Sequence, residues 1–427
     1  MTESITTKLL VIGAGTAGMA AAIFAAKKGI DCAIAGLSGE IIYASSLLDI
    51  LAVHPVSEGK LWDNPWHAIE ALRKEQPTHP YSRMTTHMIK TAFREFITTL
   101  SEAGLHYFFR ENANADVITP AGTVKRTYGV PEGIWPAVRA MEEKKPCLLI
   151  DFNGLKGYSA RQIKEVIGDR WPKMRSERID FPGRMGDLYP EHMAYELLMP
   201  KTMKQLAENV KPHVKDAEIV GFPAILGMKN IRKIMNDLKD NLGVPVFEIP
   251  TLPPNVTGLR LKNALEQRVA DLGVKHYFQY KVTRIEKEKN GNFKAVVSSQ
   301  NPGRMEDVTV FAESVILATG RFIGQGLAAE RKKIKETLFG LPVKQPMERM
   351  DWHRQHFLDP RGHGVNLAGL EVDHVFRPLN ENGEPAHDNL FAAGSILADS
   401  DWMRMKCGSG LSIASAYAAV DAITKLG

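Results

Sequence analysis

Apolar and polar positions near the start of the chain are grouped so that they predict a strand, a helix and a second strand. The apolar run Leu9–Ile12 is typical of a buried strand. The alanine-rich stretch Met19–Lys28 favours a helix, and Gly29 ends it. Asp31–Gly36 (DCAIAG) then has the pattern of a returning strand. The chain is therefore predicted to begin with a β-α-β unit.

Three glycines with the spacing G-x-G-x-x-G join the first predicted strand to the helix. Gly13 permits a tight turn, Gly15 lets the main chain approach a phosphate group, and Gly18 lets the helix pack on the strand. The first N–H groups of such a helix have no partner inside it and carry partial positive charge. The pattern predicts a dinucleotide pyrophosphate in contact with Gly13, Ala14, Gly15, Thr16, Ala17 and Gly18.

The uncharged stretch Leu9–Ala26 also resembles a membrane span or the apolar part of a signal peptide. The glycines argue against both interpretations. Three of them within six residues make a poor helix interior, at about 1 kcal/mol each relative to alanine. The β-α-β interpretation is favoured.

Helical patterns dominate the block from Leu51 to Asn241, broken by loops rich in proline and glycine. Two apolar runs inside it, Cys147–Phe152 and Glu218–Leu226, are typical of buried strands. This block is therefore predicted to be a second domain of mixed α/β structure.

The third part of the chain predicts a small antiparallel meander. A strand at 244–250 (VPVFEIP) and an amphipathic helix at Leu259–Leu272 come first. Three strand-like segments follow, separated by turns at Asn290–Gly291 and at Asn301–Pro302–Gly303. These segments are Lys275–Lys287, Phe293–Ser299 and Val308–Phe311.

The meander leads into Ser314–Gly320 (SVILATG), an apolar strand that ends on small residues. Such an order is typical of flavoproteins with a Rossmann-like domain, because a bulky side chain at the strand end would collide with the cofactor. Ala318, Thr319 and Gly320 are predicted to contact the flavin nucleotide, as is Val282 in the first meander strand.

The C-terminal part repeats the pattern of a strand that closes on small residues before a helix. Asn389–Gly394 (NLFAAG) is the strand, and Cys407–Ala419 runs from glycines into a small-residue helix. Its first N–H groups would stabilise negative charge on a reduced flavin. The predicted contacts are Gly394, Gly408, Ser409, Gly410 and Leu411, and Cys407 is either a reactive thiol at a helix start or a small packed residue.

Composition narrows the classes of function. The chain has 427 residues, 44% of them hydrophobic, and 54 basic against 49 acidic residues give a net charge of +5. No basic stripe with interleaved aromatics is seen, so nucleic acid is not an expected partner. The lysine-rich stretch Arg331–Lys335 is expected to be a solvated helix face.

Three widely spaced cysteines fit a reducing compartment and exclude an iron–sulfur cluster held by this chain alone. His353 and His356 could share a helix face, but no third ligand accompanies them and no metal site is predicted.

The predicted fold class is α/β: a Rossmann-like flavin-binding domain with a three-layer β-β-α architecture and a small β-meander, interrupted by a second α/β domain. The flavin-binding domain is predicted to consist of residues 1–52, 243–330 and 386–427. Residues 53–242 and 331–385 are assigned to the second domain, which would cap the site or bind substrate or a partner.

With these elements in order, the chain resembles the B subunit of anaerobic glycerol-3-phosphate dehydrogenase, related in fold to the succinate dehydrogenase and fumarate reductase flavoproteins. The likeness runs nearly end to end. It rests on VIGAGTAG, YASSLLDIL (Tyr43–Leu51), VITPAGT (Val117–Thr123), PPNVTGLRL (Pro253–Leu261), ATGRFIGQGL (Ala318–Leu327) and FAAGSILAD with CGSGLSIASA (within Phe391–Ala416).

The resemblance implies a complex that oxidises sn-glycerol 3-phosphate to dihydroxyacetone phosphate. Electrons would pass through two flavoprotein subunits, of which this chain is one, and an iron–sulfur subunit to quinone. It implies a cytoplasmic location, or peripheral attachment to the cytoplasmic face of the membrane. In this family FMN is usually assigned to the B subunit and FAD to its flavoprotein partner.

The choice between FAD and FMN depends on one position. FAD-binding versions of the fold place an acidic residue at the end of the second strand, where it holds the adenosine ribose. That position is Gly36 here, and Ser38 or Glu40 could substitute from the loop that follows. The glycine pattern favours FAD, with FMN as the alternative, and Gly36 is kept among the predicted contacts.

Oxidation of a secondary alcohol needs a base, and a phosphorylated substrate favours arginine or lysine nearby. The candidates are Arg321, directly after Ala318–Gly320, and Arg361 and His363 in the loop DPRGHGV, although the pattern favours a plain surface histidine over a catalytic one at position 363. Ser45 and Ser46 are predicted to lie against the flavin, with a surface turn as the competing interpretation.

Two alternative functions stay open from the sequence. The chain could be an electron-relay subunit whose flavin never meets substrate, because no single motif holds a clear arginine, histidine and acid cluster. It could also be an FAD-dependent oxidoreductase, similar to fumarate reductase, that acts on another small hydroxy or keto acid.

Overall fold

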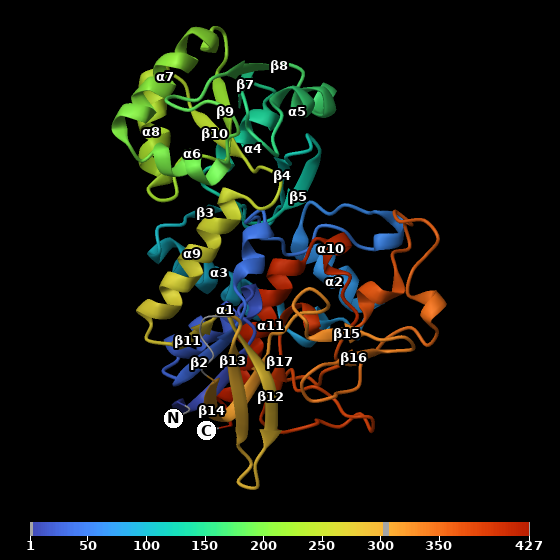
Figure 1. Cartoon of the computed structure of the whole chain (residues 1–427). Helices are drawn as coiled ribbons and strands as arrows, with labels where there is room; N and C mark the ends of the chain where they lie inside the picture. Colours follow the sequence, from blue (N-terminus) through green and yellow to red (C-terminus); the bar gives the residue numbers. More distant parts are fainter. Residues whose placement is uncertain (1–2, 302–306, 427) are drawn as a thin grey trace. The chain divides into compact units, whose positions relative to one another are not determined.

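The computed structural model describes residues 3–301 and 307–426, so Pro302 and Gly303 of the second predicted turn lie outside the described residues. The chain forms two compact units (Figure 1). The first unit contains residues 1–40, 48–99 and 265–427, and the second contains residues 41–47 and 100–264.

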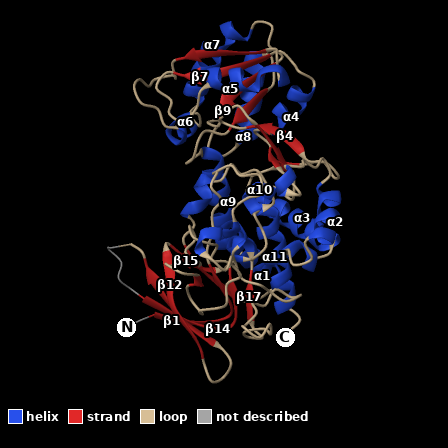
Figure 2. Ribbon diagram, turned by 90° about the vertical axis from the view of Figure 1, so that its right-hand side faces the viewer, coloured by secondary structure: helices blue, strands red, loops and turns tan. Residues whose placement is uncertain are grey.

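A mixed sheet is the main β-structure of the first unit (Figure 2). Its strands follow the order β11-β2-β1-β14-β13-β12, and β17 also pairs with β14. The strands β11, β2, β1, β14 and β17 are parallel to one another, whereas β12, β13 and β14 form an antiparallel meander. Their bounds are β1 Glu3–Ile12, β2 Cys32–Gly36, β11 Lys275–Phe278, β12 Tyr280–Lys287, β13 Phe293–Ser299, β14 Asp307–Leu317 and β17 Leu390–Ala392.

The strand β14 connects the two parts of this sheet. It lies beside β1 along its whole length, with Val11 opposite Ile316. On its other edge, the first half pairs with β13 and the second half with β17. The predicted α/β fold, with a parallel core and a meander, is therefore confirmed.

Two nearly uncharged helices, α1 (Thr16–Lys27) and α11 (Gly408–Ile423), pack against each other in the first unit. Most of their residues are buried, and the ring of Phe24 meets that of Tyr417 edge to face at 5.2 Å. Small side chains suit this position because they let helices and strands approach closely. The other elements of this unit include α2 Pro65–Glu75, α3 Thr86–Glu102 (which ends in the second unit), α10 Trp402–Met405, β15 Leu327–Ala329 and β16 Ile334–Glu336.

A parallel sheet in the order β10-β9-β7-β8 forms the centre of the second unit. Alternate residues of β7 face opposite ways: Leu148 and Ile150 pack with α6, α7 and α8, whereas Cys147 and Leu149 pack with α4 and α5. This period of two produces a helix–sheet–helix sandwich, as the prediction of a second α/β domain required. The bounds are β7 Cys147–Phe152, β8 Met174–Ile179, β9 Ile219–Pro223, β10 Val246–Ile249, α4 Trp135–Glu142, α5 Ala160–Ile167, α6 Pro190–Glu196, α7 Pro200–Val214 and α8 Ile231–Leu242.

Two short strand pairs and a long helix complete this unit. The strand pairs are β3 (Tyr107–Phe108) with β6 (Val130–Pro131), and β4 (Ala115–Ile118) with β5 (Val124–Thr127). The helix α9, Val256–Asp271, begins here and ends in the first unit.

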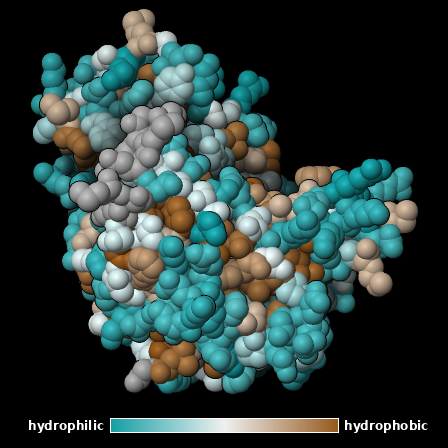
Figure 3. Space-filling model, turned by 60° about the horizontal axis from the view of Figure 1, so that its bottom comes forward, coloured by the Kyte–Doolittle hydropathy of each residue, from teal (hydrophilic) through white to brown (hydrophobic). Residues whose placement is uncertain are grey.

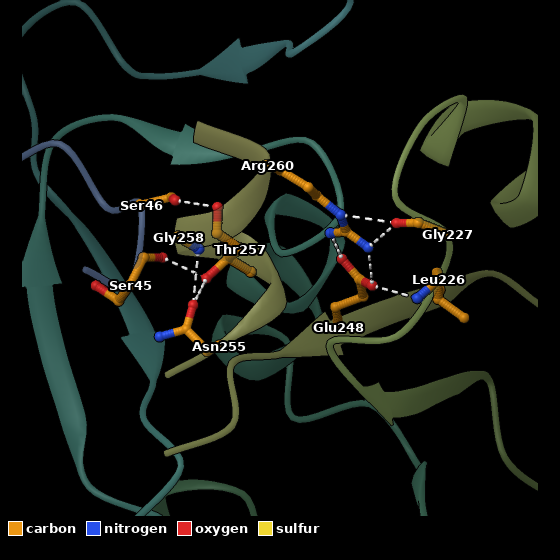
Figure 4. A network of polar contacts seen from close by, with 9 residues as sticks. All are labelled: Ser45, Ser46, Leu226, Gly227, Glu248, Asn255, Thr257, Gly258 and Arg260. Atoms are coloured by element: carbon orange, nitrogen blue, oxygen red, sulfur yellow. Dashed lines mark hydrogen bonds and ion pairs between the residues drawn. The ribbon is translucent and has the colours of Figure 1, made fainter. Parts of the chain in front are cut away.

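An ion pair buried in the second unit joins β10 to α9 (Figure 4). Glu248 is 1% exposed and Arg260 is 4% exposed, and the guanidinium donates to both carboxylate oxygens at 2.6 and 2.9 Å. The main-chain N–H of Leu226 donates to the same carboxylate, and Arg260 donates to the carbonyl oxygen of Gly227. Each charge is therefore compensated by a partner and by hydrogen bonds, as burial requires.

Three predictions differ from the structure. The strands predicted at Val308–Phe311 and Ser314–Gly320 are one continuous strand, β14, which ends at Leu317. The segment Lys275–Lys287 is two strands, because Gln279 has a left-handed backbone (φ 64°) that sends β11 to one edge of the sheet and β12 to the other. The charged residues of Arg331–Lys335 are exposed as expected, but the helix prediction was wrong. Ile334 and Glu336 point inward in alternation, which is the period of a strand.

The two units also divide the chain at places other than the predicted domain limits. Residues 53–99 and 331–385 were assigned to the second domain, yet they group with the flavin-binding segments, whereas 41–47 and 243–264 group with the other unit. Contacts distant in the sequence explain this grouping. Tyr81, for example, donates to the carbonyl oxygen of Ile50 and lies against the start of α11.

The face drawn in Figure 3 is covered mostly by hydrophilic residues, with hydrophobic ones in small areas between them. Within residues 3–301 and 307–426, we find no helix with the length and hydrophobicity needed to cross a bilayer.

The substitution Glu248→Ala should destabilise the second unit by about 3–5 kcal/mol, because it leaves the Arg260 charge buried without its partner. Urea unfolding monitored by circular dichroism measures the loss. The matched control is Glu143→Ala, which removes an exposed ion pair with Arg139 and should leave the unfolding midpoint unchanged. Equal effects of the two substitutions would contradict this interpretation of the buried pair.

Candidate functional site

The glycine turn after β1 brings three strand ends into close contact. Gly13 has φ 110°, and a Cβ atom there would overlap the carbonyl oxygen of Ala318. A Cβ atom on Gly18 would overlap the carbonyl oxygen of Gly13. Glycine is therefore required at both positions. Gly13 needs it for its left-handed backbone and for lack of space, and Gly18 needs it for lack of space alone.

Gly15, the residue before the first turn of α1, faces open space. It has extended backbone (φ −77°, ψ −174°), and a Cβ atom there would have no neighbour within 4 Å. No side chain caps the helix, and its first turn has no acidic residue. The helix start therefore presents N–H groups and partial positive charge, which suits a phosphate group close to the main chain.

The predicted residues after β14 lie beside this turn. The N–H of Ala318 donates to the carbonyl oxygen of Ile12 at 2.8 Å, so Ala318, Thr319 and Gly320 begin where β1 ends. The hydroxyl of Thr319 is buried and has no hydrogen-bond partner among the described residues. An unpaired buried hydroxyl is costly, and a bound polar ligand would satisfy it.

The two C-terminal segments also lie in contact with each other. The N–H of Gly394 donates to the hydroxyl of Ser415 on α11 at 2.8 Å, and a Cβ atom on Gly394 would lie 2.6 Å from Cβ of Ala17. Gly394, α11 and the start of α1 therefore converge at one place in the first unit.

The start of α11 is occupied by packing contacts with the segment after residue 48. Ser409 accepts a hydrogen bond from the N–H of Asp49 at 2.7 Å, and Gly410 donates to the carbonyl oxygen of Asp49 at 2.6 Å. The neighbouring Leu411 is fully buried. A Cβ atom on Gly408 would lie 2.8 Å from the ring of Trp402. The structure thus shows a packing role for these residues, and their contact with a cofactor stays a prediction.

Val282, Ser45 and Ser46 occupy other surroundings. Val282 is buried in β12, opposite Val297 of the meander. The two serines belong to the second unit, where Ser46 donates to the carbonyl oxygen of Thr257 at 2.5 Å and the carbonyl oxygen of Ser45 accepts from the Thr257 hydroxyl (Figure 4). Contact between the flavin and any of these three residues stays a prediction.

Gly36 ends β2 directly against the glycine turn. A Cβ atom there would lie 2.5 Å from the nitrogen of Ala14. The chain therefore has no room for the acidic side chain that FAD-binding versions of the fold place at this position.

Sequence reasoning missed one contact near this turn. The hydroxyl of Ser38, which is fully buried, donates to Oε1 of Glu266 at 2.6 Å. Glu266 lies on α9, and the sequence analysis predicted the helix without assigning a role to this residue. No local signal links two residues so far apart in the sequence.

The three predicted catalytic side chains are bound to their surroundings. Arg321 is 9% exposed and donates to the main-chain oxygens of Leu397 and Ser400 at 2.9 Å, and to that of Asn366. Burial lowers the pKa of Arg321 to about 10, so it stays charged at neutral pH. From its position after β14, Arg321 therefore holds together the segment around Asn366 and the loop that follows β17.

Arg361 and His363 belong to one exposed loop. Arg361 pairs with Asp359 at 2.7 Å, and this hydrogen bond lowers the pKa of the Asp359 carboxyl. Nδ1 of His363 accepts the N–H of Arg354, and Nε2 lies 2.9 Å from the carbonyl oxygen of Phe357. Their catalytic roles stay predictions.

Cys407 has the properties of a packed thiol. It is fully buried, and desolvation raises its pKa to about 12. Cys32 and Cys147 are buried as well, and burial raises the pKa of both. Of the two interpretations of Cys407, the structure favours the small packed residue.

No group of three or more histidine, cysteine or carboxylate side chains suited to a metal ion occurs in the part of the chain that the structure describes.

Comparison with known proteins gives consistent matches along the whole chain. The family described as FAD binding domain matches residues 8–411. The B subunit of anaerobic glycerol-3-phosphate dehydrogenase from Vibrio vulnificus is 27% identical over 424 residues, 96% of this chain and 95% of that protein. The probable B subunit of the same enzyme from Halobacterium salinarum is 30% identical over 432 residues, 97% of each chain.

Among solved structures, 3-ketosteroid Δ1-dehydrogenase from Sterolibacterium denitrificans is similar over 99% of this chain and 100% of that one. The sequence identity is 11% and the TM-score is 0.45. A likeness of this extent carries no argument about function.

The residues of the glycine turn fit FAD, which the family match makes the cofactor of this chain. The open space at Gly15 and the uncapped N–H groups of α1 suit a diphosphate. The buried Thr319 hydroxyl lacks a partner among the described residues, as expected at a ligand-lined position. The predicted choice of FAD over FMN is confirmed.

The substitution Gly15→Ala should weaken FAD binding at least tenfold while the apoprotein keeps its melting temperature. The new methyl group meets no protein atom, but it occupies the side from which a phosphate would approach. Titration of apoprotein with FAD, followed by flavin fluorescence, measures the affinity. In contrast, Gly18→Ala should lower the melting temperature of the apoprotein itself, because its methyl group overlaps the main chain. If Gly15→Ala lowered the melting temperature of the apoprotein as much as Gly18→Ala does, the assignment of Gly15 to cofactor binding would be contradicted.

Native Cys407 should resist iodoacetamide at about pH 8 and react after denaturation. With a pKa near 12, roughly one thiol in ten thousand is ionised at that pH, compared with about a tenth for an ordinary thiol. Mass spectrometry of the labelled peptides measures the reaction. Rapid labelling of the folded protein at Cys407 would restore the interpretation as a reactive thiol.

Proposed function

Because this chain belongs to the FAD binding domain family and to the family of anaerobic glycerol-3-phosphate dehydrogenase B subunits, we propose that it is the flavoprotein subunit of a respiratory complex. The complex would oxidise sn-glycerol 3-phosphate to dihydroxyacetone phosphate and pass the electrons to quinone. The observation that carries the proposal is the match to the Halobacterium salinarum protein over 97% of both chains.

The relatives are named as subunits, which supports function within a complex of several subunits. We propose a second flavoprotein subunit and an iron–sulfur subunit as partners. Such a complex would be attached to the cytoplasmic face of the membrane through its partners.

When bound, FAD supplies a two-electron acceptor for hydride from the substrate carbon. The start of α1 would hold its diphosphate, with Gly15 as the point of closest approach. Arg321 supplies a fixed positive charge directly after Gly320, and its three main-chain acceptors keep it in place. It would act through this charge and by positioning the loops.

His363 is the residue we propose as the base for the substrate hydroxyl. The contacts indicate that Nδ1 accepts one main-chain hydrogen bond and that Nε2 carries the proton. His363 must therefore release the Arg354 N–H before it can accept a proton. Arg361, on the same exposed loop, would bind the substrate phosphate after partial release of Asp359.

A second candidate function follows from the same contacts. All three predicted catalytic side chains already have partners within the chain, which favours a subunit that relays electrons and has no substrate site of its own. In that case Arg321 and His363 only hold the loops around the cofactor, and substrate is oxidised on a partner subunit.

The isolated chain, loaded with FAD and mixed with sn-glycerol 3-phosphate without oxygen, should lose its visible flavin absorbance. This result is expected because the proposed base and the proposed phosphate-binding arginine both lie in this chain. If the absorbance falls only after partner subunits are added, the electron-relay function is supported.

The substitution His363→Gln should lower the rate of flavin reduction by substrate about a hundredfold or more, the usual contribution of a general base. FAD content should stay unchanged. The control is His353→Gln, which alters an exposed neighbour whose ring lies 5.7 Å from that of His363. Stopped-flow absorbance measures both rates, and equal rates for the two variants would exclude His363 as the base.

A further inference from the structure

The end of β2 lacks the acidic side chain that would bind the ribose of a dinucleotide. A carboxylate at this position normally binds the adenosine ribose of a dinucleotide. Gly36 occupies the position here, and its main chain lies so close to Ala14 that no side chain would fit. A carboxylate that reaches the same place must therefore come from another element.

The contact between Ser38 and Glu266 supplies such a carboxylate. Ser38 lies two residues beyond the end of β2, is fully buried, and donates its hydroxyl hydrogen to Oε1 of Glu266 at 2.6 Å. Glu266 is half-buried on α9. This bond fixes the carboxylate at the carboxyl end of β2.

The topology of the first unit explains how α9 reaches this point. The helix leads into β11, which lies parallel to β2 with Phe278 opposite Gly36. The helix thus returns the chain to the edge of the sheet next to β2, and the hydrogen bond from Ser38 shows that Glu266 lies beside the residues that follow β2. The last part of α9, including Glu266, belongs to the same unit as Ser38 and the glycine turn.

We propose that Glu266, held in place by Ser38, binds the adenosine ribose hydroxyls of FAD in place of the absent acid at position 36. An ionised carboxylate has two oxygens that together accept about four hydrogen bonds, so it can hold the serine and ribose hydroxyls at once. Hydrogen bonds to a charged acceptor are stronger than neutral ones. The serine restricts the side chain before the ligand arrives, which reduces the entropy lost on binding.

Glu40, the other acid in the loop after β2, is exposed. An exposed glutamate must lose several free torsions to bind a hydroxyl, whereas Glu266 is already fixed. The position and the hydrogen bond of Glu266 therefore favour it over Glu40.

The test compares FAD with FMN, which has no adenosine. Apoprotein is titrated with each flavin, and quenching of flavin fluorescence gives the two dissociation constants. The substitution Glu266→Gln should raise the dissociation constant of FAD about tenfold or more and leave that of FMN within twofold. The substitution Ser38→Ala should raise the FAD value by about threefold, because it frees the carboxylate without removing it.

An FAD analogue with 2′-deoxyadenosine identifies the ligand group involved. The wild-type chain should bind this analogue more weakly than FAD. The Glu266→Gln variant should bind the two equally, because the analogue and the substitution each remove the contact between the ribose 2′-hydroxyl and the carboxylate. The control is Asp271→Asn on the same helix, which should change neither affinity. Melting of each apoprotein verifies that the variants fold.

Equal effects of Glu266→Gln on FAD and FMN would overturn the proposal, as would an unchanged preference for FAD over the deoxy analogue. These measurements use binding alone. They are therefore independent of whether the chain oxidises sn-glycerol 3-phosphate, and the failure of one proposal leaves the other in place.

Discussion

The close approach of main chains at the carboxyl ends of β1, β2 and β14 is the constraint on which the rest of the structure depends. Gly13 meets Ala318, Gly18 meets Gly13, and Gly36 meets the nitrogen of Ala14, each at a distance that excludes a Cβ atom. This contact sets the start of α1 beside the residues that follow β14. It thereby leaves the uncapped N–H groups of α1 beside the residues that follow β14, where a phosphate group can approach the main chain.

The same close approach prevents β2 from binding the ribose of the cofactor through a side chain of its own. With no side chain possible at Gly36, the usual carboxylate for the ribose cannot sit on β2. The proposed arrangement places that carboxylate on α9, where Ser38 binds Glu266. Close packing at the end of β2 is thus compatible with recognition of a dinucleotide, because α9 supplies the carboxylate for which β2 has no space.

Charged residues after the strand ends make mainly structural contacts. Arg321 binds main-chain oxygens in two loops, and Arg404 donates to that of Asp359 in the exposed loop that carries His363. A charge held in this way is well placed to orient a ligand, and poorly placed to exchange a proton. Because the arginines serve to hold and orient, the proposed removal of a proton from the substrate hydroxyl depends on His363, the one imidazole among the three candidates.

The sequence by itself determined the elements whose signals are local. The glycine spacing predicted the turn of Gly13–Gly18, the apolar runs predicted β7 and β13 to the residue, and the small residues of 318–320 predicted their place beside the turn. It did not reveal the break at Gln279 or the role of Glu266, because a left-handed glutamine and a helical glutamate leave no distinctive local pattern. Only the tertiary structure decided these. The strand order places β11 and β12 at opposite edges of one sheet, and packing brings Glu266 to Ser38, 228 positions away, whereas sequence patterns report on near neighbours.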